Sequence, residues 1–319
     1  MFFVHRDIMK PLIDKVSRED ILRELSPERF VRYTNFGHNE IYIFLGDDAP
    51  ALMTEIGRLR EIAFREAGGG TGEPVDIDEF DKGSNAYYQL IVWNPIEQEI
   101  IGGYRYIKLK DTHPDEHGHY HLATTHMFRF SEKFMDDYFQ DTIELGRSFV
   151  QPQYQPSRDS RKGIFSLDNL WDGLGGLIIM HPEIKYFYGK VTMYLKYDQF
   201  ARDVIMAFLM KHFPDRDNLV WAYVPRPIRT TEDVIRNILH GKTYEEDKTL
   251  LMRFVRSRGM NFPPLVNAYM NLTNSMRTFG SSLNDTFGDV EEIGILVNIA
   301  DIYESKKHRH LASFYKGRE

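Results

Sequence analysis

The sequence predicts a single domain of the mixed α/β class. Strand-like and helix-like patterns follow one another along its 319 residues, beginning with the apolar run IYIFL at 41–45 and the amphipathic stretch that Pro50 opens. Hydrophobic residues make up 42% of the chain and aromatic residues 13%, so it can bury a large core and is not composed like a disordered protein. No linker rich in proline, glycine and serine divides the sequence, which indicates one domain rather than two.

Charge and residue content exclude several classes of function. The formal net charge is −7, so the chain lacks the basic excess of a general nucleic-acid binder. It contains no cysteine, which excludes disulfides and thiolate catalysis, and its histidines at 113–126 lack the spacing of a metal site. The longest apolar run, near 174–180, is too short to span a bilayer. We therefore expect a cytoplasmic protein with no transmembrane segment, no nucleic-acid partner and no metal.

Apolar periodicity places the individual elements. The helix that begins at Pro50 has one apolar face and ends at Gly68, the first of three glycines. Strands are expected at 41–45, 87–93, 100–109, 119–125, 142–150, 186–193 and 291–302. Further helices are expected at 128–139, 163–180, 199–213, 244–258 and 263–276.

Three other segments complete the expected organisation. Residues 1–35 are predicted to be a helical extension, in which Ser17 is the N-cap of one helix. Residues 36–305 form the domain itself, with a helical insertion near 225–260. The tail at 306–319 is basic and is expected on the surface, either solvated or in peripheral contact with anionic lipid headgroups.

Four acids crowd into the sequence VDIDEFD: Asp76, Asp78, Glu79 and Asp81. Such a cluster is either a solvated acidic face or a patch that grips a cationic amine or a basic partner. The strand that follows begins with two glycines, GGYR, which are typical of a bulge or a close backbone approach. An arginine on that strand, Arg105, could pair with the acids through charge-assisted hydrogen bonds.

The stretch ELGRSFVQPQY at 144–154 carries an acid and a base on a strand that runs into a turn. Glu144 and Arg147 are three residues apart, so their side chains point to opposite faces unless a bulge intervenes, and Gly146 favours one. Two interpretations stay open. The pair is either an ordinary salt-bridged strand, or a site in which Glu144 is an acid, a base or a carboxylate that orients an amine.

Cations precede the helix that is expected to begin near Gly163. Arg158, Arg161 and Lys162 would lie at its N-terminus, where the helix dipole disfavours cations unless an anion binds there. A solvated loop is the alternative interpretation.

Taken in order, these motifs resemble a known family. DIDEFD, GGYRYI, ELGRSFVQPQY and the helix FSLDNLWDGLGGL are similar to the hemolysin-like acyltransferases of the GNAT superfamily, which include ornithine-lipid and other N-acyl amino acid synthases. FPPLVNAYMNL and SSLNDTFGDVEEIGILVNI resemble the closing segment of the same family. Acyl-homoserine-lactone autoinducer synthases are a more distant likeness. The resemblance covers roughly residues 38–302.

The resemblance implies a GNAT fold, with a mainly antiparallel sheet, flanked by helices, that splays at the strand holding Glu144. It implies an N-acyltransferase of aminolipid biosynthesis, in which an acyl-carrier protein or coenzyme A thioester is the co-substrate and no cofactor is permanently bound. The acceptor would be the amine of an amino acid. The segment QPQYQPSRDSRKG is longer than the usual phosphate loop of the family, which favours the carrier protein as donor.

The resemblance also implies roles for single residues. Glu144 would be catalytic, and the acceptor would be bound by Asp78, Asp81, Arg105 and Arg147. The thioester and its phosphopantetheine would be bound by Phe149, Val150, Arg158, Arg161, Lys162 and Gly163. Two alternatives keep the same fold: a non-catalytic acyl or acyl-carrier binding module, and an autoinducer-type synthase.

Overall fold

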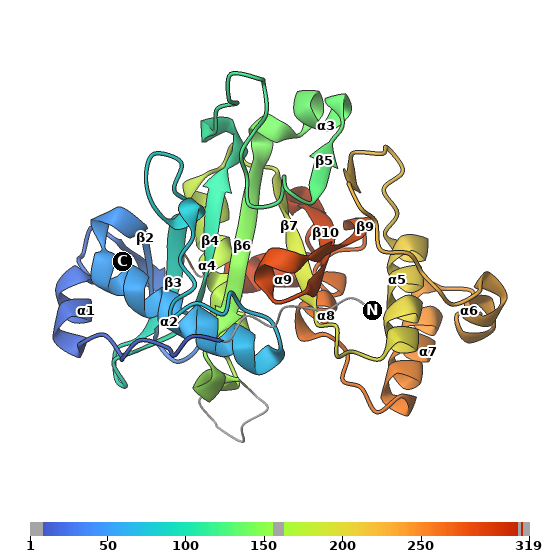
Figure 1. The fold of residues 1–319 in the computed structure, drawn as a ribbon, viewed down its shortest axis with the longest axis horizontal. Helices are drawn as coiled ribbons and strands as arrows, with labels where there is room; N and C mark the ends of the chain where they lie inside the picture. The colour runs from blue at the N-terminus through green and yellow to red at the C-terminus, as the bar shows by residue number, and fades with distance from the viewer. Residues whose placement is uncertain (1–8, 156–162, 312–313, 315–319) are drawn as a thin grey trace.

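One mostly antiparallel sheet organises the chain (Figure 1). The structure, a computed structural model, describes residues 9–155, 163–311 and 314, and within these residues eight strands form the sheet in the order β1-β2-β3-β4-β6-β7-β10-β9. β5 and β8 pair separately. The strands are β1 (Phe30–Tyr33), β2 (Glu40–Leu45), β3 (Tyr88–Asn94), β4 (Glu99–Lys108), β5 (Phe128–Phe130), β6 (Thr142–Val150), β7 (Tyr186–Met193), β8 (Val220–Ala222), β9 (Arg277–Asn284) and β10 (Val290–Asn298).

Helices cover both faces of the sheet. The long helix α2 crosses in front of β3, β4 and β6 in Figure 1, and α4 and α5 lie on the opposite face, where they share one core with α7 and α8. The helices are α1 (Arg18–Glu24), α2 (Pro50–Ala67), α3 (Glu132–Asp137), α4 (Ser166–Met180), α5 (Gln199–His212), α6 (Glu232–Ile238), α7 (Tyr244–Ser257), α8 (Pro264–Met270) and α9 (Glu304–His310). The mixed α/β class is therefore confirmed.

The strand β3 shows how the sequence specifies both layers. Its sequence YQLIVWN has four consecutive apolar residues, Leu90 to Trp93, because both faces of the strand are covered there. Ile91 and Trp93 pack in the core under α2, whereas Leu90 and Val92 pack with α4 on the other side. Each face of the strand thus has its own hydrophobic core.

The sheet opens between two adjacent strands near its centre, β6 and β7. They pair in parallel over 142–145 and 186–189 only. Beyond Leu145, β6 stays paired with β4, and beyond Gly189, β7 stays paired with β10. We call the unpaired stretch, 146–150 against 190–193, the splay. The splay lies in β6, the strand that holds Glu144, as the resemblance implied.

Most predicted elements are confirmed to within three residues, but four predictions need correction. Within the described residues, 9–35 hold only the short helix α1 and the strand β1, although Ser17 does cap α1. Residues 119–125 form only an isolated bridge at Tyr120 and the start of a turn at Ala123, and 128–139 divides into β5 and α3. The helix expected at 263–276 ends at Met270, and after a turn the chain enters β9 at Arg277, beside β10.

The basic tail was expected on the surface, either solvated or in contact with anionic lipid headgroups. Its first residues form α9, which packs on α4: Arg309 Nη2 lies 2.6 Å from Asp168 Oδ2, and His310 Nδ1 lies 2.7 Å from Asp172 Oδ1. His310 is buried. In the part of the chain that the structure describes, none of the helices has the length and hydropathy that crossing a bilayer requires.

The two glycines of GGYR allow a close backbone approach, as predicted. A Cβ on Gly102 would collide with the carbonyl oxygen of Phe149 and lie 3.1 Å from the Cα of Val150. A Cβ on Gly103 would collide with the carbonyl oxygen of Leu90. β4 can therefore lie between β3 and β6 only without side chains at these positions.

We expect Gly102→Ala to destabilise the protein by about 1–3 kcal/mol, because rigid backbone would have to move to accept the new methyl group. Gly146→Ala is the matched control on the neighbouring strand, since its Cβ would lie 3.5 Å from Arg105 Nε, an ordinary contact distance. Thermal or urea unfolding of both variants measures the difference. Equal midpoints for the two variants would contradict this account of GGYR.

Candidate active site

The acidic segment between α2 and β3 folds back on itself through its own carboxylates. Asp78 caps the turn Glu79–Asp81 and accepts a hydrogen bond from the Phe80 N–H at 2.9 Å. Asp81 in turn accepts from the Asp78 N–H at 3.1 Å. This reciprocal capping box fixes both carboxylates against the sheet.

Asp81 is the centre of a group of buried charges. Its Oδ1 accepts from Arg60 Nη1 and from Gln89 Nε2, both at 3.0 Å, and its Oδ2 lies 3.2 Å from Arg105 Nη1. Burial alone would raise the pKa of Asp81, but the Arg60 and Arg105 guanidinium groups outweigh it and hold the pKa below its usual range. Asp81 is therefore a buried anion.

Arg105 connects Asp81 to the outer acids. Its Nη1 also donates to Asp78 Oδ1 at 2.5 Å, and its guanidinium lies over the rings of Phe80 and Tyr87. Asp76 and Asp81 are fully buried, so the interpretation of this cluster as a solvated face is wrong for both of them. Burial alone would lower the pKa of Arg105, but the Asp81 and Asp78 carboxylates outweigh this effect and raise the pKa.

Arg147 reaches the same acids because β6 contains a bulge. Gly103 pairs with Phe149 and Arg105 with Gly146, so β6 has one extra residue between these pairs. The left-handed residue of the bulge is Arg147, with φ of 49°, and Gly146 is not left-handed. Arg147 Nε lies 2.9 Å from Asp76 Oδ2, and Nη2 lies 3.1 Å from Asp78 Oδ2.

These contacts define one unit, which we call the charged network: Arg60, Asp76, Asp78, Asp81, Arg105 and Arg147. It contains all four residues that were predicted to bind the acceptor. Arg60 and Asp76 were not predicted as site residues. The sequence does hold a signal for Arg60, which occupies the apolar stripe of α2 between Ile56 and Phe64, four residues from each.

Glu144 lies beside this network on the same face of the sheet, but in a different electrostatic setting. It is fully buried and accepts from the Tyr87 hydroxyl at 3.1 Å and from Thr124 Oγ1 at 2.9 Å. The Tyr87 oxygen accepts from the Ala123 N–H at 3.0 Å, which orients its own proton toward Glu144. No ion pair holds Glu144 within the described residues, so the salt-bridged-strand interpretation does not apply to it.

Burial raises the pKa of Glu144 to about 7, although the hydrogen bonds from Thr124 and Tyr87 act in the opposite direction. A carboxyl group with this pKa exchanges a proton near neutral pH, as a general base must. Across from it on β7, the Tyr188 hydroxyl is buried and makes no hydrogen bond that meets standard geometry among the described residues.

Two of the residues expected to bind the thioester, Phe149 and Val150, lie at the splay. Phe149 is buried in the core under α2. The Gln151 N–H donates to the Ile101 carbonyl at 2.9 Å, and because N–H groups alternate in direction along a strand, that of Val150 points to the β7 side. Gly163 packs against the Tyr154 backbone, three residues before α4 begins. Arg158, Arg161 and Lys162 lie outside the described residues.

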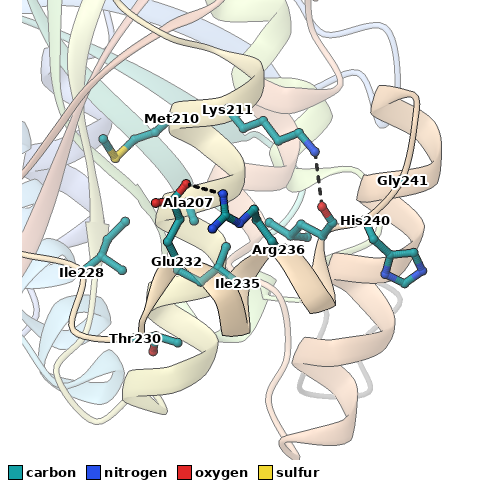
Figure 2. Close-up of a pocket in the computed structure, with 11 residues that line it drawn as sticks. Ala207, Met210, Lys211, Ile228, Thr230, Glu232, Ile235, Arg236, His240 and Gly241 are labelled. Carbon is teal, nitrogen blue, oxygen red and sulfur yellow. Dashed lines mark hydrogen bonds and ion pairs between the residues drawn. The ribbon is translucent and has the colours of Figure 1, made fainter.

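A separate cavity lies between α5 and α6 (Figure 2). It has a volume of about 800 Å³ and an apolar wall that includes Met210, Ile228 and Ile235, with Arg236 paired to Glu232 at its rim. It shares no residue with the charged network. Among the residues that the structure describes, no three His, Asp or Glu side chains are arranged to hold a metal ion.

The raised pKa of Glu144 predicts a pH-dependent stability. Folded Glu144 holds its proton up to pH about 7, against an ordinary value of 4.5. The stabilisation is therefore full below pH 4.5 and is lost as the pH rises through 7, by about 3 kcal/mol at 1.36 kcal/mol per pKa unit. We expect the difference in unfolding free energy between the protein and Glu144→Gln to change in this window. A difference that stays constant from pH 5 to 8 would contradict the raised pKa.

Comparison with known proteins identifies the family of the chain. A family model described as "Acetyltransferase (GNAT) domain" matches residues 59–161. "Glycine N(alpha)-acyltransferase" of Phocaeicola vulgatus is 51% identical over 308 residues, which is 97% of this chain and 94% of that protein. The protein of the same name from Bacteroides thetaiotaomicron is 51% identical over 306 residues, 96% of this chain and 91% of that protein. No solved structure matches the chain. From the extent of these likenesses and the splayed sheet, the chain belongs to the N-acyltransferases of the GNAT superfamily.

Proposed function

We propose that this acyltransferase moves a fatty acyl group from a thioester to the α-amino group of glycine. The observation that carries the proposal is Glu144, a buried carboxyl group with a pKa of about 7 that lies where the pairing of β6 and β7 ends. The names of the two relatives, each 51% identical over nearly the whole chain, support glycine as the acceptor.

In the proposed reaction the amine nitrogen attacks the thioester carbonyl carbon. Glu144 takes the proton that the ammonium group must lose, directly or through one water molecule. The carbonyl oxygen gains negative charge, and the Val150 N–H on the open side of β6 supplies a donor for it. The carbon–sulfur bond then breaks, the nitrogen loses its second proton as the amide forms, and the departing thiolate takes up that proton.

The charged network would frame the acceptor. Asp81 and Arg105 are held by their contacts, whereas Asp78 and Arg147 are the most exposed members of the network, with 29% and 12% of their side chains accessible. The phosphate of the pantetheine arm would lie at the start of α4, beyond Gly163. Arg158, Arg161 and Lys162 keep their predicted role there.

We further propose an acyl-carrier protein as the donor and an N-acyl amino acid, an aminolipid, as the product, as in the hemolysin-like branch. The support is the long segment 151–163, which lacks the compact phosphate loop that would grip coenzyme A. A lipid product is also consistent with a cytoplasmic enzyme that works at the membrane surface.

We expect Glu144→Gln to lower kcat by about 10²–10⁴-fold, the usual contribution of a general base. Wild-type kcat/KM should rise with pH through about 7, as Glu144 loses its proton, and the variant should lack this inflection. Glu61→Gln is the matched control, because Glu61 is fully buried but binds Arg65 and the 71–72 backbone away from the splay. Product formation is measured by mass spectrometry. An unchanged kcat in Glu144→Gln would remove Glu144 from the mechanism.

The donor is tested with one acyl chain presented on acyl-carrier protein and on coenzyme A. We expect kcat/KM to be at least about tenfold higher with the carrier protein, equivalent to about 1.4 kcal/mol. A preference for the coenzyme A thioester would leave the acyltransferase intact and overturn the choice of donor.

A further inference from the structure

The space that a side chain at residue 146 would occupy is open, although it lies at the centre of the sheet. We call this space the position over Gly146. Gly146 pairs with Arg105 on β4, and continuing the register of Leu145 with Gly189 would place it level with Lys190 on β7. A Cβ at Gly146 would meet only two Arg105 atoms, at 3.5 and 3.6 Å, within 4 Å. Gly146 is half-buried, whereas Glu144 and Leu145 before it are buried. The missing side chain leaves room beside Arg105.

The Nε–H group of Arg105 lies beside this position and donates no hydrogen bond within the described residues. Nη1 of this arginine is engaged by Asp78 and Asp81, but Nε is buried and has no hydrogen-bond partner among the described residues. It is this Nε that lies 3.5 Å from the place of a Gly146 Cβ. A buried N–H without a partner is costly, so a ligand acceptor over Gly146 would satisfy it.

Across the splay is Lys190, the first β7 residue beyond the paired stretch. Glu144 lies opposite Tyr188, and Lys190 is two residues further along β7, so all three side chains are on one face. Only 10% of the Lys190 side chain is exposed, and its one ion-pair partner among the described residues is Glu292, at 3.5 Å. Glu292 already accepts from Thr192 Oγ1 at 2.9 Å.

The electrostatic balance at Lys190 favours a further anion. Burial lowers the pKa of Lys190, Arg147 and Arg105 lower it further, and only Glu292 and Glu144 oppose them. Arg105, Arg147 and Lys190 are therefore close enough to repel one another. One bound carboxylate would relieve their repulsion and supply the short partner that Lys190 lacks.

We propose that the position over Gly146 binds the α-carboxylate of the acceptor amino acid, with Lys190 and the Nε–H of Arg105 as its donors. This inference rests on the proposed function and deepens it, because it makes the enzyme specific for α-amino acids rather than for amines in general. The amine is one carbon away from the carboxylate, and Glu144, on the same face, is the neighbouring base. Lys190 would contact the substrate directly.

The test compares glycine with glycinamide, which keeps the amine and lacks the charged carboxylate. We expect the wild-type protein to prefer glycine and Lys190→Met to lose about 10- to 100-fold of kcat/KM with glycine, mainly through KM, as expected for one charge-assisted hydrogen bond. Its kcat/KM with glycinamide should change little. Each enzyme is scored by its own ratio of the two acceptors, so the different basicities of the amines cancel.

Two further variants separate a ligand role from a structural one. Lys190→Met/Glu292→Gln removes both charges of the pair, so it should still lose the preference for glycine if Lys190 binds the carboxylate. The double variant should instead regain the preference for glycine if Lys190 serves only to neutralise Glu292. Gly146→Ala fills the proposed position with a contact that the fold accepts, and should raise the KM for glycine more than for glycinamide.

Lys185→Met is the matched control, since Lys185 precedes β7 and pairs with Asp141 at the surface. It should retain the wild-type ratio. If the wild type acylates glycine but Lys190→Met keeps the preference for it, or loses both acceptors equally, the inference is overturned and the proposed function stands. If the wild type acylates no amino acid, the proposed function and this inference fall together.

Discussion

The burial of Asp81 is the constraint on which the rest of the site depends. A carboxylate removed from water is stable only when its oxygens are fully engaged, and here α2, β3 and β4 each contribute a partner: Arg60, Gln89 and Arg105. Because Arg105 is held in this way, it can hold Asp78, which in turn meets Arg147. One buried anion therefore fixes the helix and the central strands relative to one another and orients the charges at the surface of the site.

Backbone geometry on β6 then determines which side chains share a face. An unbroken strand would turn Arg147 away from Glu144, and the bulge turns it back. A left-handed arginine costs of order 1–3 kcal/mol, and the contacts with Asp76, Asp78 and the Phe287 ring, 4.2 Å away, offset that cost. The same strand loses its β7 partner directly after Leu145. The bulge and the splay together bring the base, the cations and an open strand edge to one place.

Two buried carboxyl groups near each other have opposite properties for a physical reason. Asp81 is surrounded by guanidinium groups and stays ionised, whereas Glu144 contacts hydroxyl groups and has a pKa of about 7. Environments that separate the pKa values of neighbouring acids are typical of acid–base chemistry. The charged network thus provides fixed charge, and Glu144 provides an exchangeable proton. The Nε–H of Arg105 adds a donor without a partner among the described residues, and Lys190 adds a cation whose ion pair with Glu292 is 3.5 Å long.

The sequence by itself determined the elements whose signal is local. α2, β6 and β7 follow from apolar periodicity, Pro50 and the terminal glycine, and the motif order identified the family and five residues that the fold brings together. Only the tertiary structure decided β9, which forms because β10 pairs with it, and the left-handed position of Arg147. It also decided the buried role of Arg60 and the pKa of Glu144. These depend on partners that are distant in sequence, such as Gln89 for Arg60 and Thr124 for Glu144, and a local pattern carries no information about such contacts.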